Sequence, residues 1–180
     1  DYEYEMFRLV KSSNHVSCQD NPNKFREVRH SIFQLWPHEL LSAYLMNLCD
    51  AIQHGRNLFT EKYARMDNLI PPINSHPIIN EIVKIEAQWQ AEIQYKYPAL
   101  YSRLCRNTEP YEESTNFSVY LRCELETYGD TTLAIYYEWV KQAKDSGKNY
   151  SLLMLKNIIK KSGFENIQKA ETFWSEQMLK

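Results

Sequence analysis

Two cationic side chains occupy positions at which helical spacing predicts apolar ones. Arg29 shares its expected helix face with a set of apolar residues: Phe25, Val28, Ile32, Phe33 and Trp36. Lys62 falls on a second apolar face, formed by Leu58, Tyr63 and Met66. Removing a cation from water costs several kcal/mol unless an anion pairs with it. We therefore expect anionic groups beside both residues.

The first explanation is a bound ligand. A planar guanidinium holds a phosphate, sulfate or carboxylate through two parallel hydrogen bonds. Arg29 and Lys62 would then accept an anionic small molecule or an acidic peptide. The polar residues expected to assist them are His30, Asn57, Ser17, Cys18 and Gln19. This explanation predicts a binding or adaptor module with an anion-accepting pocket in the first part of the chain, and it leaves room for a protein partner.

Two further explanations need no ligand. In one, Arg29 forms an internal ion pair with a carboxylate, and Lys62 extends along apolar surface until its ammonium reaches water. The candidate carboxylates are those of Glu3, Glu5, Glu39 and Glu61. In the other, a C-terminal helix covers only the second half of the chain, and the first half stays solvated around its cations. The sequence leaves these explanations and the ligand open.

An enzyme is the alternative to a binding protein. Cys18 would be the nucleophile, with His15 three residues before it, or Arg29 and Lys62 would stabilise a developing negative charge. Apart from His15, no base stands at motif spacing from a nucleophile. The sequence therefore favours binding and assigns no catalytic residue.

A metal site is not expected. Glu27 and His30 have the Glu-x-x-His spacing that di-iron helical bundles use. Such a site needs a second pair, and the matching positions later in the chain hold Val119 and Arg122. One pair alone does not supply enough ligands.

The chain contains two similar segments that align without a gap. The segment from Phe25 to Met66 matches the segment from Phe117 to Ile158, so the offset is 92 positions. Identical pairs are Phe25/Phe117, Leu41/Leu133, Tyr44/Tyr136, Ala51/Ala143, Gly55/Gly147 and Asn57/Asn149. In this alignment Arg29 corresponds to Leu121, and Lys62 corresponds to Met154. We expect an internal duplication, with cations in the first copy where the second has apolar side chains.

Helical periodicity dominates the elements that must position these residues. Gly55 and Gly147 predict left-handed helix stops, and Asn57 and Asn149 predict caps of the helices that follow. We expect helices over about 2–11, 24–35, 37–54, 58–66, 78–97, 114–128, 131–146, 150–162 and 165–180, and a short helix after Pro98. The predicted fold is all-α in a single domain over 1–180. Repeat one (1–66), a linker (67–77) and repeat two (78–162) pack about a pseudo-twofold axis, and the extra C-terminal helix (165–180) braces repeat two.

Composition excludes several classes of protein. The 180 residues carry a net charge of −2 with both signs mixed, which makes a nucleic-acid partner unexpected. Four glycines are too few for a Gly-rich phosphate loop, and no cofactor is indicated. The apolar runs are too short for a membrane span, and the acidic opening does not resemble a secretory leader. The four cysteines lack metal-binding spacing, so we expect reduced thiols in a cytoplasmic protein.

Three motifs resemble a family. They are Ser17-Cys18-Gln19, the stretch from Gly55 to Met66 with its Glu61-Lys62-Tyr63-Ala64-Arg65 core, and the stretch from Tyr120 to Leu125. Together they resemble the bacterial domain-of-unknown-function family DUF4125, over nearly the whole chain. The resemblance implies a small bacterial cytoplasmic helical protein without an assigned activity. It supplies no catalytic residues, but its polar motifs favour the pocket.

Overall fold

Helices are the only regular secondary structure in the part of the chain that the structure describes. The computed structural model describes residues 1–11, 21–106 and 116–178. Its helices are α1 (Tyr2–Phe7), α2 (Pro22–Phe33), α3 (His38–Gln53), α4 (Leu58–Met66), α5 (Ile78–Lys96), α6 (Pro98–Leu104), α7 (Phe117–Leu125), α8 (Asp130–Asp145), α9 (Tyr150–Lys161) and α10 (Ile167–Met178). The prediction of an all-α fold is confirmed. None of these helices combines the length and the apolar character needed to cross a bilayer.

Glycine residues end helices and asparagine residues cap the helices that follow, as predicted. Gly55 and Gly147 have φ values of 66° and 69°, a backbone region in which a residue with a Cβ is strained. The side chain of Asn57 accepts a hydrogen bond from the backbone N–H of Thr60 and caps α4. Asn149 caps α9 in the same way through the N–H of Leu152. Helices α3 and α8 begin 92 positions apart, as do α4 and α9.

Several helix ends differ from the sequence prediction because caps and tight turns intervene. Helix α1 ends at Phe7, since the N–H groups of Leu9 and Val10 bond three residues back. Helix α7 begins only at Phe117, because the side chain of Asn116 takes the capping position. Helix α8 begins at Asp130, one residue before the expected start, and Gly129 precedes it at the cap.

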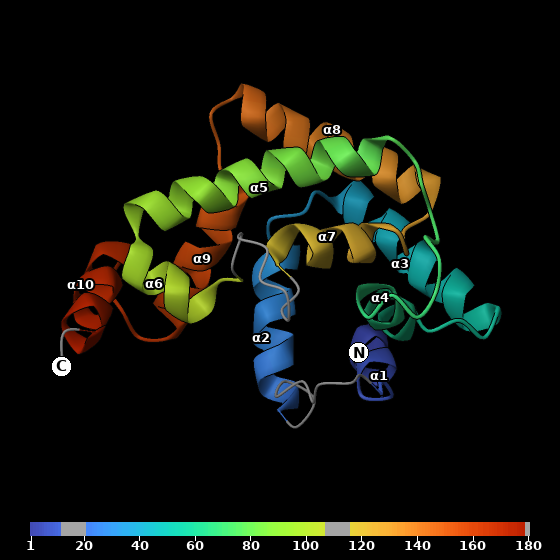
Figure 1. Cartoon of the computed structure of the whole chain (residues 1–180), viewed down its shortest axis with the longest axis horizontal. Coiled ribbons are helices and arrows are strands. Elements are labelled where there is room, and N and C mark those ends of the chain that lie inside the picture. Colours follow the sequence, from blue (N-terminus) through green and yellow to red (C-terminus); the bar gives the residue numbers. More distant parts are fainter. Residues whose placement is uncertain (12–20, 107–115, 179–180) are drawn as a thin grey trace.

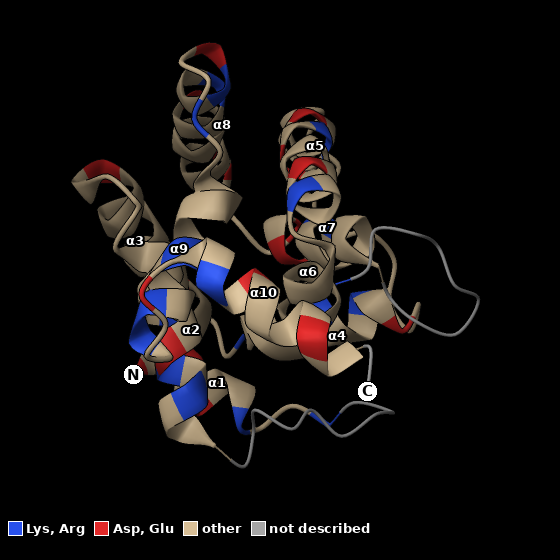
Figure 2. Ribbon diagram, turned by 90° about the vertical axis from the view of Figure 1, so that its left-hand side faces the viewer, with Lys and Arg blue, Asp and Glu red and all other residues tan. Residues whose placement is uncertain are grey.

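The arrangement of the helices is shown in Figure 1. Helices α5 and α8 lie side by side, and α7 packs beneath α5. Helix α4 joins α7 to α1, while α2 packs against α9. Ribbons coloured by charge show Lys and Arg interspersed with Asp and Glu over the helices in view (Figure 2).

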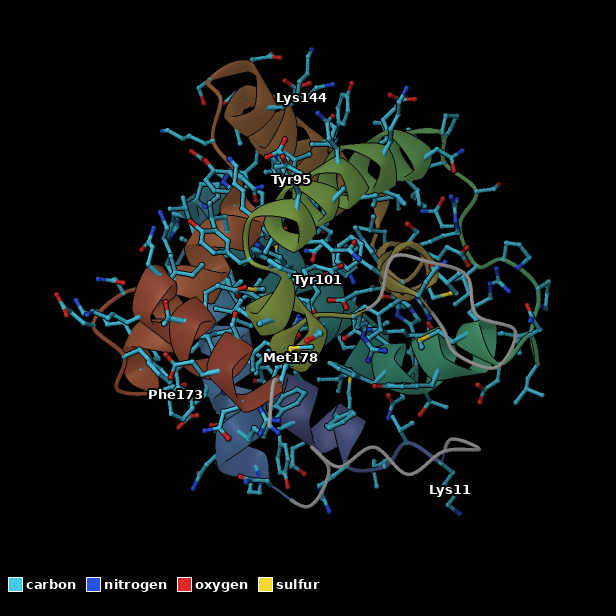
Figure 3. All side chains as sticks on the ribbon, turned by 60° about the vertical axis from the view of Figure 1, so that its left-hand side comes forward. Lys11, Tyr95, Tyr101, Lys144, Phe173 and Met178 are labelled. Carbon is cyan, nitrogen blue, oxygen red and sulfur yellow. The ribbon has the colours of Figure 1, made fainter. Side chains whose placement is uncertain are left out.

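Two clusters of buried side chains form the core. The larger one is formed by side chains of α1–α5, α7 and α8 and of the turns next to them. The smaller one joins α5, α6, α9 and α10 through Ile93, Leu100, Tyr101, Leu155, Ile159, Ile167 and Ala170. Figure 3 shows Met178 of α10 beside α6, where the Ser102 hydroxyl lies 3.9 Å from the Met178 sulfur. The C-terminal helix thus packs on the second half of the chain. The relation of the halves by a twofold axis stays a prediction.

Candidate functional site

Arg29 is buried in an ion-pair network. Its side chain leaves α2 and is 10% exposed. Nε donates to Glu3 Oε2 at 2.9 Å, Nη2 donates to Glu3 Oε1, and Nη1 donates to Glu124 Oε1 at 3.1 Å. Burial by itself disfavours the charged guanidinium, but Glu3 and Glu124 outweigh burial and hold the pKa of Arg29 well above its usual value.

Lys62 of α4 completes the same network from the other side of Glu124. Its Nζ donates to Glu124 Oε2 at 2.5 Å and lies 3.4 Å from the centre of the Tyr120 ring. The side chain is 3% exposed, so the expected extension of Lys62 to water is wrong. The solvated first half is wrong for the same reason, because both cations are buried.

Glu124 is the carboxylate that links the two cations. Burial alone would raise its pKa, but Lys62 and Arg29 lower it to about 2. The Tyr128 hydroxyl donates to the same carboxylate at 3.2 Å. Glu3 was among the predicted partners of Arg29, whereas Glu124 was not. The sequence does place Glu124 on the apolar stripe of α7, three residues after Leu121, and that position could have identified it as a buried carboxylate.

The space next to Lys62 is very small. A cavity lined by Tyr44, Leu58, Phe59, Lys62, Glu124 and Thr127 has a volume of about 10 Å³. That is about the space that one water molecule needs. A phosphate group does not fit there unless side chains move.

The remaining predicted residues do not gather around these cations. Asn57 is fully used by the fold, since its carbonyl caps α4 and its Nδ2 donates to the Met6 carbonyl at 2.9 Å. His30 is exposed, with Nδ1 3.0 Å from Lys161 Nζ. Ser17, Cys18 and Gln19, and His15 with them, lie outside the described residues.

The polar motif on α4 joins this helix to α7. Arg65 Nε donates to Glu126 Oε2 at 2.6 Å, and Arg56 Nη2 donates to Glu61 Oε2 at 2.7 Å. Glu61 and Arg65 thus have other partners, although they stand four residues apart on the same helix. Lys62 and Arg65 both reach carboxylates near the end of α7.

A second cavity, much larger, lies between α2, α5, α7 and α9. Its volume of about 500 Å³ is within the range of small-molecule sites. Aromatic and aliphatic side chains form most of its wall, among them Trp36, Trp89, Leu121, Tyr136, Trp139, Tyr150, Met154 and Leu155. Lys24, Arg103 and Arg106 also line it and are exposed to solvent, so they mark where the cavity opens.

Two buried polar side chains of α5 line this cavity. Glu86 is 9% exposed and accepts a hydrogen bond of 2.6 Å from the Tyr136 hydroxyl. No Lys, Arg or His among the described residues forms an ion pair with it. Burial raises the pKa of Glu86 to about 7, against the opposing hydrogen bond from Tyr136. Gln90, one turn further along α5, is 5% exposed, and the structure gives its amide no hydrogen bond to a described residue. The sequence analysis missed both residues, although their spacing of four on an apolar helix was visible.

The chain matches one protein family over most of its length. The family described as "Protein of unknown function (DUF4125)" matches residues 1–172. The chain belongs to the DUF4125 family. The resemblance expected from its motifs is thereby confirmed. No curated protein and no solved structure matches it.

Described cysteines of this DUF4125 chain are free thiols. They are Cys49, Cys105 and Cys123. Cys105 lines the large cavity, but burial raises its pKa to about 12. Burial also raises the pKa of Cys123. Both are therefore protonated at neutral pH and are poor nucleophiles.

Proposed function

We propose that this protein binds a small molecule with an aromatic or apolar body in the 500 Å³ cavity between α2, α5, α7 and α9. The observation that carries the proposal is the wall of the cavity. It combines aromatic rings with buried polar groups, Glu86 and Gln90, whose hydrogen-bonding capacity the protein leaves partly unused. A few polar groups in a mostly apolar wall are typical of ligand sites.

A third polar group in this wall has no partner among the described residues. The indole N–H of Trp36 is buried without a hydrogen-bond acceptor. Leaving a buried donor unsatisfied costs about 1 to 3 kcal/mol. The indole nitrogen has almost no surface open to the cavity, so a ligand there would meet the ring of Trp36 and not its N–H.

The predicted binding of an anion fits the opening of the large cavity better than it fits the buried cations Arg29 and Lys62. Arg29 and Lys62 already neutralise Glu3 and Glu124, so an external anion would have to displace a carboxylate. Lys24, Arg103 and Arg106 are exposed at the opening, where an anionic group of a ligand would meet them. In this proposal Arg29 and Lys62 support the wall of the cavity, and the enzyme alternative loses its electrostatic stabilisers.

The test is binding of 1-naphthylmethanol, a neutral aromatic probe, measured by isothermal titration calorimetry. We expect saturable binding to the wild-type protein. Ser151 and Met154 line the cavity on α9, so Ser151→Trp and Met154→Trp should each weaken binding about 10-fold or more by filling it. Ser146→Trp is the matched control, because Ser146 is exposed at the end of α8.

Absence of saturable binding of any naphthyl probe, neutral or charged, to the wild-type protein would overturn the proposal. So would wild-type affinity in both cavity-filling variants, since the probe would then bind elsewhere. Circular dichroism and a melting curve establish that each variant is folded before its affinity is compared.

A further inference from the structure

The surroundings of Glu86 repeat those of Glu3 in the first half. Glu3 accepts a hydrogen bond of 2.7 Å from Tyr44, and Glu86 accepts one of 2.6 Å from Tyr136. These tyrosines are equivalent at the offset of 92 positions. A second contact is also shared. Each glutamate stands three residues before a residue whose backbone carbonyl accepts a hydrogen bond from the side chain of a helix-capping asparagine.

That second contact involves the two equivalent asparagines. Asn57 Nδ2 donates to the Met6 carbonyl at 2.9 Å, and Asn149 Nδ2 donates to the Trp89 carbonyl at 3.1 Å. The same two kinds of hydrogen bond, one from a tyrosine and one from an asparagine, therefore connect α1 and α5 to their neighbouring helices. The comparison identifies Glu86 as the counterpart of Glu3.

The two glutamates differ in one respect, the cation. Glu3 receives two hydrogen bonds from the guanidinium of Arg29. The position equivalent to Arg29 is Leu121, a residue that is 8% exposed and lines the large cavity together with Glu86. The second half thus keeps the carboxylate and its tyrosine, and it has a cavity where the first half has a guanidinium.

Aromatic rings surround this cavity beside Glu86. Trp89 lies one turn after Glu86 on α5, and its ring centre is 5.9 Å from that of Tyr150. Tyr150 stacks on Trp139 at 4.2 Å, and Trp139 meets Tyr136 edge to face at 5.5 Å. We call Trp89, Tyr136, Trp139 and Tyr150 the aromatic cluster. The faces of such rings attract cations, most strongly where water is excluded.

We propose that the cavity recognises an organic cation, a primary amine or a guanidinium on an aromatic or apolar body, with Glu86 as its counter-ion. Gln90 offers a further hydrogen-bond acceptor, and the aromatic cluster contributes cation–π contacts. The ligand then takes the place that Arg29 holds beside Glu3. This inference rests on the proposed small-molecule function and adds to it a cationic group that the ligand places beside Glu86.

The test compares two probes of nearly equal size at pH 8. They are 1-naphthylmethylamine, which is cationic, and 1-naphthylmethanol, which is neutral. We expect the wild-type protein to bind the amine about 10-fold or more tightly than the alcohol, as hydrogen bonds between charged partners are the stronger ones. Glu86→Gln should bring the two affinities within about 2-fold of each other.

Two further variants sharpen the comparison. Glu81→Gln removes an exposed carboxylate of the same helix and should leave the preference for the amine unchanged. Leu121→Arg copies the first half and supplies an internal cation, so it should abolish amine binding. It should also raise the melting temperature at pH 8, an effect that mere filling of the cavity would not produce.

The outcomes separate the two proposals. If neither probe binds the wild-type protein, the small-molecule function fails and the inference falls with it. If both probes bind equally, or if Glu86→Gln keeps the preference, the cavity binds ligands but the inference about charge is overturned. Amine binding that is unaffected by Leu121→Arg in a folded protein would also overturn it.

Discussion

Arg29 and Glu124 are 95 residues apart in the chain and are joined by a hydrogen bond of 3.1 Å. This bond connects α2 to α7, and the bonds from Arg29 to Glu3 connect α2 to α1. One guanidinium therefore ties three helices together in the interior. Its removal leaves two buried carboxylates short of a partner.

We expect Arg29→Leu to destabilise the protein by about 3 to 5 kcal/mol, since breaking a buried pair leaves uncompensated charge. The free energy of unfolding in urea at pH 7 measures this. The matched control is Arg26→Leu in the same helix. Arg26 forms an exposed pair with Asp1, so its loss should cost at most about 1 kcal/mol. Equal effects of the two substitutions would contradict a structural role for Arg29.

Lys62 and Glu124 should be strongly coupled. Lys62→Met copies the residue of the second half, and Glu124→Gln keeps the shape of the side chain. In a double-mutant cycle we expect a coupling energy of about 1 to 3 kcal/mol, because the pair is buried and directly hydrogen-bonded. The same cycle for the more exposed pair of Arg56 and Glu61 should give less than about 1 kcal/mol. Additive effects of Lys62→Met and Glu124→Gln would contradict the network.

Stability should fall in acid because of Glu124. Its pKa is about 2 in the folded protein and near 4.5 in the unfolded chain, so the unfolded state binds more protons between these values. The contribution is present above about pH 5 and is lost as pH falls towards 2, with a size of about 3 kcal/mol. Urea unfolding from pH 7 to pH 3 should show a smaller acid loss in Glu124→Gln than in the wild type. Parallel pH profiles would refute the assignment.

Glu86 should have the opposite effect. Its folded pKa of about 7 lies above the unfolded value, so the folded state binds more protons and stability falls as pH rises from about 4.5 to 7. Tyr136 and Glu124 act on it directly. Among the described residues, the other ionisable side chains lining the same cavity are Lys24, Arg29, Tyr63, Arg103, Cys105, Arg106, Tyr120, Tyr128 and Tyr150.

We expect Glu86→Gln to be more stable than the wild type at pH 8, by up to about 3 kcal/mol, and equal to it near pH 4. Thermal and urea unfolding at the two pH values measure the difference. A constant difference between variant and wild type at both pH values would show that Glu86 does not titrate in this range.

Local signals in the sequence predicted most of the fold. Gly55, Gly147 and the two capping asparagines act within one turn of a helix, so their role is visible from neighbouring residues. The buried cations were also visible, because Arg29 and Lys62 interrupt apolar faces. Their shared partner was not, since Glu124 is brought to them only by the packing of α4 and α2 against α7 and the residues near it.

The cavity was beyond the sequence for a similar reason. Its wall comes from several helices whose distances depend on side chains packed elsewhere, so no single segment contains its signature. Glu86 and Gln90 could have been noticed as polar interruptions of an apolar helix, just as Arg29 was. Comparison with Glu3 required the structure, because α1 and α5 lie outside the aligned segments.

The placement of Glu3 and Met6 on the short helix α1 has a practical consequence for fragment design. These residues supply the carboxylate for Arg29 and the carbonyl for Asn57, so a recombinant piece that starts after position 11 would lack both. Crystallisation or display formats that trim the amino end to remove a tail would unintentionally discard an anchor of α2 and α4.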